Sequence, residues 1–283
     1  MERDRKRKLW KITAAVSAGI LVILAAVLLI RKYMPTGQKM SGYDYFKTDS
    51  AAENDSTLVI LDNEILYDKG RYIDGRLYLQ QSFVQDNVNM RFYYDKESNA
   101  VLYSDWSAVY TYYPDVKGYR DQNGNTYDTE YEVIKTADGV IYINFEYMAA
   151  VSNISYEYAK EPQRLVLHTT HEEQNEVTIR KNTVVRYRAG IKSKVLEKVK
   201  KGTVCQYVGA IDDDWIEVIT PSGYQGYVKK NAASDVYTAV PEDTYTEEYQ
   251  SNLCGYKVNM TWFQVTQRAA NAYIDTYLED VSG

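Results

Sequence analysis

The side chains best suited to metal or acid–base chemistry are few and lie in two short stretches. His168 and His171 lie near the end of an expected strand, and Asp212–Asp214 is a run of three carboxylates. A copper centre needs several imidazoles, and these are the chain's two histidines. Three successive carboxylates on a hairpin cannot all face one ion. We therefore expect solvated histidines, a solvated acidic turn, and no metal or cofactor.

Nucleophilic catalysis is not indicated either. Neither Cys205 nor Cys254 has a histidine beside it in the sequence, and the G-x-S-x-G, P-loop and H-E-x-x-H patterns are absent. Cys205 is expected in a packed strand and Cys254 in a linker. Two cysteines do not make a disulfide framework, and whether they pair stays open. No catalytic residue is expected within these 283 residues.

One apolar run decides on which side of a membrane the other elements lie. Residues 12–30 read ITAAVSAGILVILAAVLLI without a charge, and about 19 residues span roughly 28 Å as a helix, enough to cross a bilayer. Six basic residues precede the run and only three follow it closely, which predicts that residues 1–33 are a cytoplasmic tail plus a transmembrane anchor. The alternatives are a cleaved signal peptide, although no small-x-small site follows, and a buried core helix.

The charge balance differs on the two sides of this run. Residues 1–32 carry a net charge of +6, and the rest of the chain carries −12. An acidic exterior repels phosphate backbones, so nucleic acid is not expected as a partner. The length predicts more than one compact unit beyond the anchor.

The first folded unit is expected after a polar stretch. Residues 34–56 are rich in small and polar residues without periodicity, which predicts a linker that lifts the next unit off the membrane. Two short β-rich runs follow at 57–61 and 64–67. Asp62-Asn63 between them favours a tight hairpin.

A shift of 64 positions aligns two stretches of the chain without a gap. DGRLYLQQSFVQDNVNMRFYYDKESNAVLY falls on DGVIYINFEYMAAVSNISYEYAKEPQRLVL, which indicates an internal repeat of turn, strand, short helix and closing hairpin. The equivalent positions include Asp74-Gly75 and Asp138-Gly139, Tyr78 and Tyr142, Leu79 and Ile143, Asn89 and Asn153, and Lys96-Glu97 and Lys160-Glu161.

This unit resembles the copper amine oxidase N-terminal-like domain found in exported bacterial proteins. The resemblance covers about residues 57–170 and depends on the DG-x-LYL-x-x-x-F, FYYD and VLY patterns. Between the two copies the sequence is rich in tyrosine. Aromatic faces can stack on sugar rings, but tyrosine is also a common residue of half-buried strands, and the second explanation is favoured.

Residues 171–237 show closely spaced alternating runs with turn residues between them, which is typical of a small β-barrel. The VRYRAG, KGT, W-x-x-V and G-x-x-GYV motifs resemble the bacterial Src-homology-3-like domain, with Ile191 where that family usually has proline. The resemblance implies binding of cell-wall peptides or glycan. The groove residues that it implies are Tyr187, Trp215, Tyr224 and Tyr227. Trp215 and Tyr227 occupy positions that often serve barrel packing instead.

The C-terminal part changes character after an acidic linker at 238–254. In residues 255–283 an alternating strand precedes an amphipathic helix, and the pair resembles the opening βα unit of a family-18 glycoside hydrolase barrel. Such a barrel takes about 250 residues, and the DxxDxDxE signature of that family is absent from this sequence. The raised-pKa carboxylic acid needed for glycoside hydrolysis is therefore not expected here.

The predicted fold class is mainly β or α+β, with an N-terminal transmembrane helix, a repeated ββαββ sheet domain, a small barrel and an incomplete βα unit. The predicted location is the cell membrane, single-pass, with most of the chain outside. The predicted function is the wall-binding region of a family-18-like hydrolase acting on peptidoglycan or chitin, with the catalytic barrel missing. Its partners would be the membrane, the wall glycan or peptide, and that barrel. The alternative is a non-enzymatic envelope scaffold complete at residue 283.

Overall fold

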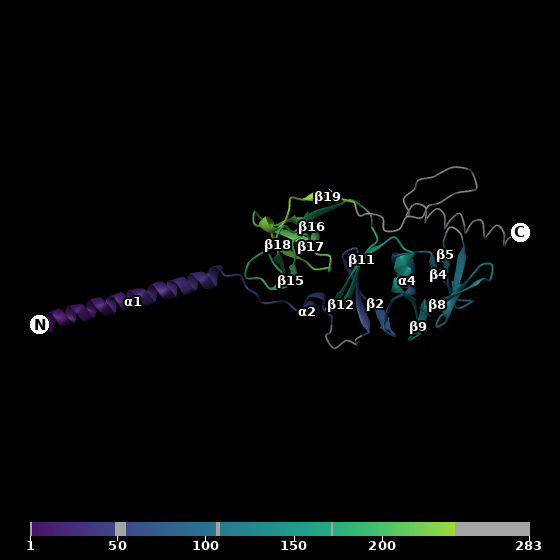
Figure 1. Ribbon diagram of the computed structural model, residues 1–283, viewed down its shortest axis with the longest axis horizontal. Helices are drawn as coiled ribbons and strands as arrows, with labels where there is room; N and C mark the ends of the chain where they lie inside the picture. The colour runs from purple at the N-terminus through teal and green to yellow at the C-terminus, as the bar shows by residue number, and fades with distance from the viewer. Residues whose placement is uncertain (1, 49–54, 106–107, 171, 241–283) are drawn as a thin grey trace.

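The structure is a computed structural model that describes residues 2–48, 55–105, 108–170 and 172–240. It is mainly β, as predicted, with few helices. Helix α1 (Glu2–Tyr33) contains a segment, Val16–Tyr33, that is long and apolar enough to cross a membrane and is not buried by the rest of the chain. Such a helix fits a membrane anchor and also a signal sequence. Figure 1 shows α1 extending away from the β-rich body.

Sheet 1 has seven strands in the order β11-β12-β1-β2-β3-β10-β9. Its strands are β1 (Ser56–Leu61), β2 (Glu64–Ile73), β3 (Arg76–Gln80), β9 (Ile134–Ala137), β10 (Val140–Asn144), β11 (Ser155–Lys160) and β12 (Gln163–His168). The pairing of β1 with β12 is parallel. Residues 58–61 of β1 form an unbroken apolar run because both faces of the strand are buried: Val59 faces one core, and Leu58 and Ile60 face another.

Sheet 2 lies at the end of the body farthest from α1 (Figure 1) and has five strands in sequence order. They are β4 (Phe92–Asp95), β5 (Ala100–Ser104), β6 (Val109–Tyr112), β7 (Lys117–Asp121) and β8 (Thr126–Glu132). Helices α3 (Gln81–Asn87) and α4 (Phe145–Ala150) pack in the first core, together with the inner face of this sheet. Tyr103 and Tyr112 are buried there, and the Tyr112 and Tyr147 hydroxyls are hydrogen-bonded. Many of these tyrosines therefore serve packing.

Sheet 3 has seven strands in the order β15-β14-β18-β17-β16-β13-β19. They are β13 (Gln174–Thr178), β14 (Thr183–Arg186), β15 (Val195–Val199), β16 (Val204–Ala210), β17 (Trp215–Ile219), β18 (Gln225–Lys229) and β19 (Tyr237–Ala239), with a 3₁₀ helix, η1 (Lys230–Ala232), before β19. Apolar residues from sheet 3 and the Leu58, Ile60 and Val166 side chains of sheet 1 form the second core. Sheets 1 and 3 therefore share buried surface.

Residues 34–48, which we call the strap, lie against sheet 3. The Thr36 amide donates to the Ile191 carbonyl at 2.8 Å, and the Met40 amide donates to the Val195 carbonyl at 2.8 Å. Helix α2 (Gly42–Phe46) follows, and Phe46 is fully buried in the second core. This differs from the free spacer that the sequence predicts, because Phe46 of GYDYF is buried at the junction of sheets 1 and 3 and Tyr45 packs beside it.

The predicted hairpins are present. Asp62 and Asn63 both have positive φ, 47° and 74°, in the turn that joins β1 to β2. The turns at Asp74-Gly75 and Asp138-Gly139 also have positive φ and join β2 to β3 and β9 to β10. Short polar residues and glycine tolerate this conformation, which is why these sequence signals are dependable.

Candidate functional site

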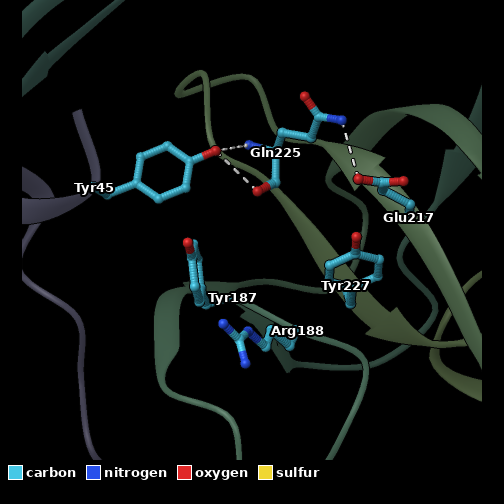
Figure 2. A pocket seen from close by; sticks show the side chains of 6 residues that line it. All are labelled: Tyr45, Tyr187, Arg188, Glu217, Gln225 and Tyr227. Atoms are coloured by element: carbon cyan, nitrogen blue, oxygen red, sulfur yellow. Dashed lines mark hydrogen bonds between the residues drawn. The ribbon is translucent and has the colours of Figure 1, made fainter. Parts of the chain in front are cut away.

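An open pocket with a volume of about 340 Å³ lies where the strap meets sheet 3. Its lining residues are Tyr45, Tyr187, Arg188, Glu217, Gln225 and Tyr227. Figure 2 shows three tyrosine rings around the opening, with the side chains of Arg188 and Glu217 on opposite sides. The pocket therefore combines aromatic surface with one positive and one negative group.

Tyr45 reaches the pocket from α2. The helix begins after Ser41, whose Oγ accepts a hydrogen bond from the Tyr43 amide at 3.2 Å, and Phe46 fixes the helix in the second core. The Tyr45 hydroxyl donates to the Gln225 carbonyl at 2.9 Å and accepts from the Gln225 amide at 2.9 Å. These two bonds attach the strap to β18 at the rim of the pocket (Figure 2).

Tyr187 and Arg188 follow β14 directly. The Tyr187 amide donates to the Lys194 carbonyl at 3.0 Å, and the Arg188 amide donates to the Ser193 hydroxyl at 2.8 Å, so this loop is held closed across its base. The Arg188 guanidinium lies 5.7 Å from the centroid of the Tyr187 ring. Tyr187 keeps 43% of its surface exposed, which leaves its ring free to contact a ligand.

Glu217 and Tyr227 are neighbours across β17 and β18. The Gln225 side-chain amide donates to a Glu217 carboxylate oxygen at 3.0 Å. Burial raises the pKa of Tyr45, and burial followed by the Glu217 charge raises the pKa of Tyr227. Both phenols are therefore protonated at neutral pH, and the Tyr45 hydrogen is already donated to the Gln225 carbonyl.

The aromatic faces and the two charges define what the pocket can bind. Tyr187 and Tyr227 offer flat apolar surface, while Arg188 can pair with a carboxylate and Glu217 can pair with an ammonium or accept from hydroxyl groups. A polar ligand that carries both kinds of group, such as a short peptide on a glycan, fits this arrangement best.

The structure brings two of the four predicted groove residues into the pocket. Tyr187 and Tyr227 line it. Trp215 lies on the same face of β17 as Glu217 but is only 7% exposed. The Lys229 ammonium lies 6.0 Å from the centroid of the Trp215 ring. Tyr224 is 6% exposed, and its ring centroid lies 4.9 Å from that of Phe46.

Four lining residues were not predicted. Glu217 and Gln225 lie two residues from the predicted Trp215 and Tyr227, so strand alternation carried a signal for them, whereas Arg188 directly follows Tyr187 in the loop after β14. Tyr45 lies far away in the sequence, in a stretch predicted as spacer. Its sequence signal was the aromatic cluster in GYDYF, which a free linker has no reason to contain.

The other candidate groups lie apart from one another. His168 ends β12, with its Nδ1 3.9 Å from an Asp62 carboxylate oxygen, and burial lowers its pKa. His171 and Cys254 lie outside the described residues. Cys205 is buried in β16, as expected, and Asp212–Asp214 form an exposed turn. Among the described residues, no group of three or more histidine, cysteine or acidic side chains is placed to hold a metal ion.

Comparison with known proteins adds no relative. No family model matches the sequence, no curated protein matches it significantly, and no solved structure matches it significantly. The function of the chain must therefore be inferred from its own residues, above all from the pocket and from α1.

Proposed function

We propose that this chain is the membrane-anchored, extracytoplasmic, wall-binding region of a family-18-like glycoside hydrolase that acts on peptidoglycan or chitin. The observation that carries the binding role is the pocket, in which Tyr187, Arg188, Glu217 and Tyr227 line one opening. Helix α1 would hold this pocket against the envelope from the outside of the cell.

The chemistry of the wall favours this ligand. Peptides attached to wall glycan carry free carboxylates and amines, and amino sugars present flat apolar faces edged by hydroxyl groups. Arg188 suits the carboxylates, Glu217 suits the amines, and the tyrosine rings suit the sugar faces. A purely anionic polymer would fit less well, because Glu217 and its partner Gln225 lie on the opposite side of the opening from Arg188 (Figure 2).

The glycines of the proposed Src-homology-3-like motif support that assignment. A Cβ atom on Gly226 would lie 2.7 Å from the Arg186 carbonyl oxygen and 2.8 Å from the Leu196 and Val185 side chains. Gly223 has φ of 84°, which favours glycine. In G-x-x-GYV, one glycine therefore allows the turn and the other lets β18 approach β14.

The proposed repeat is supported by how β3 and β10 pair. Leu79 lies opposite Ile143, which is its own equivalent after the shift of 64 residues. Tyr78 pairs with Asn144, and the equivalents of these two, Tyr142 and Gln80, also pair. Such reciprocal pairing is what a local two-fold axis between two copies produces. Each short helix also packs on the central strand of the other copy, α3 on β10 and α4 on β3.

The enzymatic part of the proposal rests on residues 255–283, which lie outside the described residues. The coding sequence beyond Gly283 tests it directly. An open frame with further βα units and a DxxDxDxE strand supports the hydrolase. A stop codon there supports the non-enzymatic scaffold instead.

The binding role is tested with the full chain in detergent and purified cell walls. We expect sedimentation with walls for the wild type, and at least about tenfold weaker binding for Tyr187→Ala and for Glu217→Gln, as for central contacts of a binding site. Tyr93→Ala is the matched control, because Tyr93 is a 54% exposed tyrosine on β4 of sheet 2.

Circular dichroism of each variant separates lost binding from lost folding. Competition with soluble wall peptides, and separately with peptide-free glycan, identifies which component the pocket takes. Wild-type protein that stays in the supernatant, or pocket variants that bind as well as Tyr93→Ala, would overturn the binding role.

A further inference from the structure

A basic surface lies where α1 meets sheet 3. It is formed by residues 31–40 and 186–195, which we call the basic collar. Its exposed basic residues are Arg31, Lys32, Lys39, Arg188, Lys192 and Lys194. Neither segment contains an aspartate or glutamate, although the chain beyond residue 32 carries a net charge of −12. The collar is therefore a positive surface on an otherwise acidic exterior.

Backbone contacts hold the two segments of the collar together. The Lys192 ammonium donates to the Arg31 carbonyl and, at 2.6 Å, to the Met34 carbonyl. The buried Arg186 guanidinium donates to the Thr36 carbonyl at 3.1 Å and to the Ser193 carbonyl at 2.7 Å. The loop of sheet 3 is thus bound directly to the end of α1.

These contacts also fix the height of the collar relative to a bilayer. The uncharged apolar run of α1 ends at Ile30, and α1 itself ends at Tyr33, an exposed aromatic residue of the kind that lies at the membrane interface. Lys192 binds carbonyl groups on both sides of Tyr33. Its ammonium therefore lies at the level of the polar headgroups, a layer of only about 5–8 Å on each side of the hydrocarbon core.

We propose that the basic collar binds the headgroups of anionic phospholipids in the outer leaflet. This rests on the proposed function only in requiring that α1 spans the membrane. Exposed lysine and arginine at a surface of anionic lipid are attracted to it, and the attraction weakens with salt. A wall polymer is the weaker candidate because the hydrogen bonds to α1 hold this face at the lipid surface. The pocket would then open at a fixed orientation beside the membrane, since Arg188 belongs to both surfaces.

The test uses the full chain in nanodiscs made of phosphatidylcholine alone or of phosphatidylcholine with phosphatidylglycerol. Acylation of lysine side chains, measured residue by residue by mass spectrometry, reports which ammonium groups the lipid covers. We expect Lys39 and Lys194 to be acylated at least about threefold more slowly in the anionic nanodiscs, and the difference to vanish at high salt. Lys96 and Lys117, exposed on sheet 2, should react equally in both.

Hydrogen exchange of two charge-reversal double variants provides a second measurement. In the double variant Lys39→Glu, Lys194→Glu, we expect the hydrogen exchange of residues 187–194 to become independent of lipid charge. The double variant Lys96→Glu, Lys117→Glu makes the same change in net charge on sheet 2 and should leave the lipid dependence intact.

The outcomes separate the lipid contact of the basic collar from the transmembrane role of α1. Protein that fails to enter nanodiscs would overturn the transmembrane role of α1. Protein that enters them and shows equal acylation of Lys39 and Lys194 in neutral and anionic lipid would overturn the lipid contact alone. Protection by a soluble glycerol-phosphate polymer but not by anionic lipid would also overturn it.

Discussion

The Tyr45 hydroxyl forms two hydrogen bonds of 2.9 Å with the backbone of Gln225, one as donor and one as acceptor. The residues are 180 positions apart, and their contact attaches the segment that follows α1 to the rim of the pocket. The strap and sheet 3 therefore both line the pocket.

The first prediction removes this hydroxyl. Tyr45→Phe keeps the ring but leaves both Gln225 groups without this partner, so we expect a loss of about 1–2 kcal/mol in the free energy of unfolding and several-fold weaker wall binding. Tyr43→Phe, on the same helix, is the control and should change neither. Urea denaturation followed by circular dichroism, and wall sedimentation, measure the two effects. Unchanged binding by Tyr45→Phe would show that the strap does not contribute to the pocket.

The second prediction concerns the close approach of α2 to the turn between β11 and β12 and to Tyr224, which precedes β18. A Cβ atom on Gly42 would lie 2.5 Å from the Glu161 carbonyl oxygen and 2.7 Å from the Tyr224 hydroxyl. Gly42→Ala should therefore displace α2 and cost about 1–3 kcal/mol. Gly37→Ala is the matched control, because a Cβ atom there meets nothing within 4 Å, and it should leave stability unchanged or slightly higher. Equal stability of the two variants would contradict the packing described here.

The third prediction concerns Arg164, which is 3% exposed between the rings of Phe46 and Tyr224, at 4.8 and 4.7 Å from their centroids. Its guanidinium donates to the carbonyls of Ser222, Glu161 and Pro162 at 2.6, 3.2 and 3.2 Å. Arg164→Met keeps much of the apolar stem but leaves these carbonyls unpaired, so we expect a loss of about 2–4 kcal/mol in the free energy of unfolding.

An arginine-to-methionine change at an exposed position is the control for Arg164→Met. Arg120→Met on β7 of sheet 2 should cost less than about 0.5 kcal/mol. Limited proteolysis of Arg164→Met should also cut between sheets 1 and 3 before either sheet unfolds. A variant that resists protease as the wild type does would mean that Arg164 does not hold the two sheets together.

Local patterns predicted much of this fold. The uncharged run before Arg31 predicts α1, and Asp62-Asn63 predicts the first hairpin, because both signals depend on residues adjacent in sequence. The strap was missed because its order comes from contacts with residues more than a hundred positions away, such as Ile191 and Val195. Local polarity says nothing about such contacts.

The pocket was predicted in part for a similar reason. Tyr227 lies on the same face of β18 as Gln225 and lines the pocket, whereas Tyr224 precedes this strand and is buried beside Phe46. The motif resemblance did not separate these two environments. Tyr45 could not be assigned to the pocket from sequence, because its position follows from the packing of Phe46 between sheets 1 and 3.

The fourth prediction tests the paired strands at the centre of the proposed repeat. Leu79 and Ile143 are fully buried and opposite each other, so Leu79→Ala and Ile143→Ala should each cost about 2–5 kcal/mol. Because the two residues are paired in one core, the cost of the double variant should differ from the sum of the single costs by about 0.5–3 kcal/mol. Leu102→Ala on β5 is the control and should be additive with either. Strict additivity of the Leu79 and Ile143 changes would argue against their direct contact.

The fifth prediction concerns the thiol of Cys205, which is 1% exposed in β16. Burial, followed by the Glu197 charge, raises its pKa to about 12. In a chain with Cys254→Ser, iodoacetamide at about pH 8.5, near the ordinary thiol pKa, should therefore modify Cys205 only where urea unfolds sheet 3. A cysteine placed next to it by Val204→Cys, in a chain that also carries Cys205→Ala and Cys254→Ser, should react at once, because Val204 is 41% exposed.

The same raised pKa gives the sign of a pH dependence. Between about pH 8.5 and 12 the unfolded chain releases the thiol proton while the folded chain retains it, so rising pH favours unfolding through this group. The stabilising contribution of this protonated thiol is complete below about pH 8.5 and is lost as the pH approaches 12. Over this range the free energy of unfolding falls by about 1.4 kcal/mol per pH unit through this group. Cys205→Ala should therefore show a shallower loss of stability over this range in urea denaturation. Equal slopes for the two chains, or fast alkylation of the folded protein, would show that the thiol is not held protonated in the core.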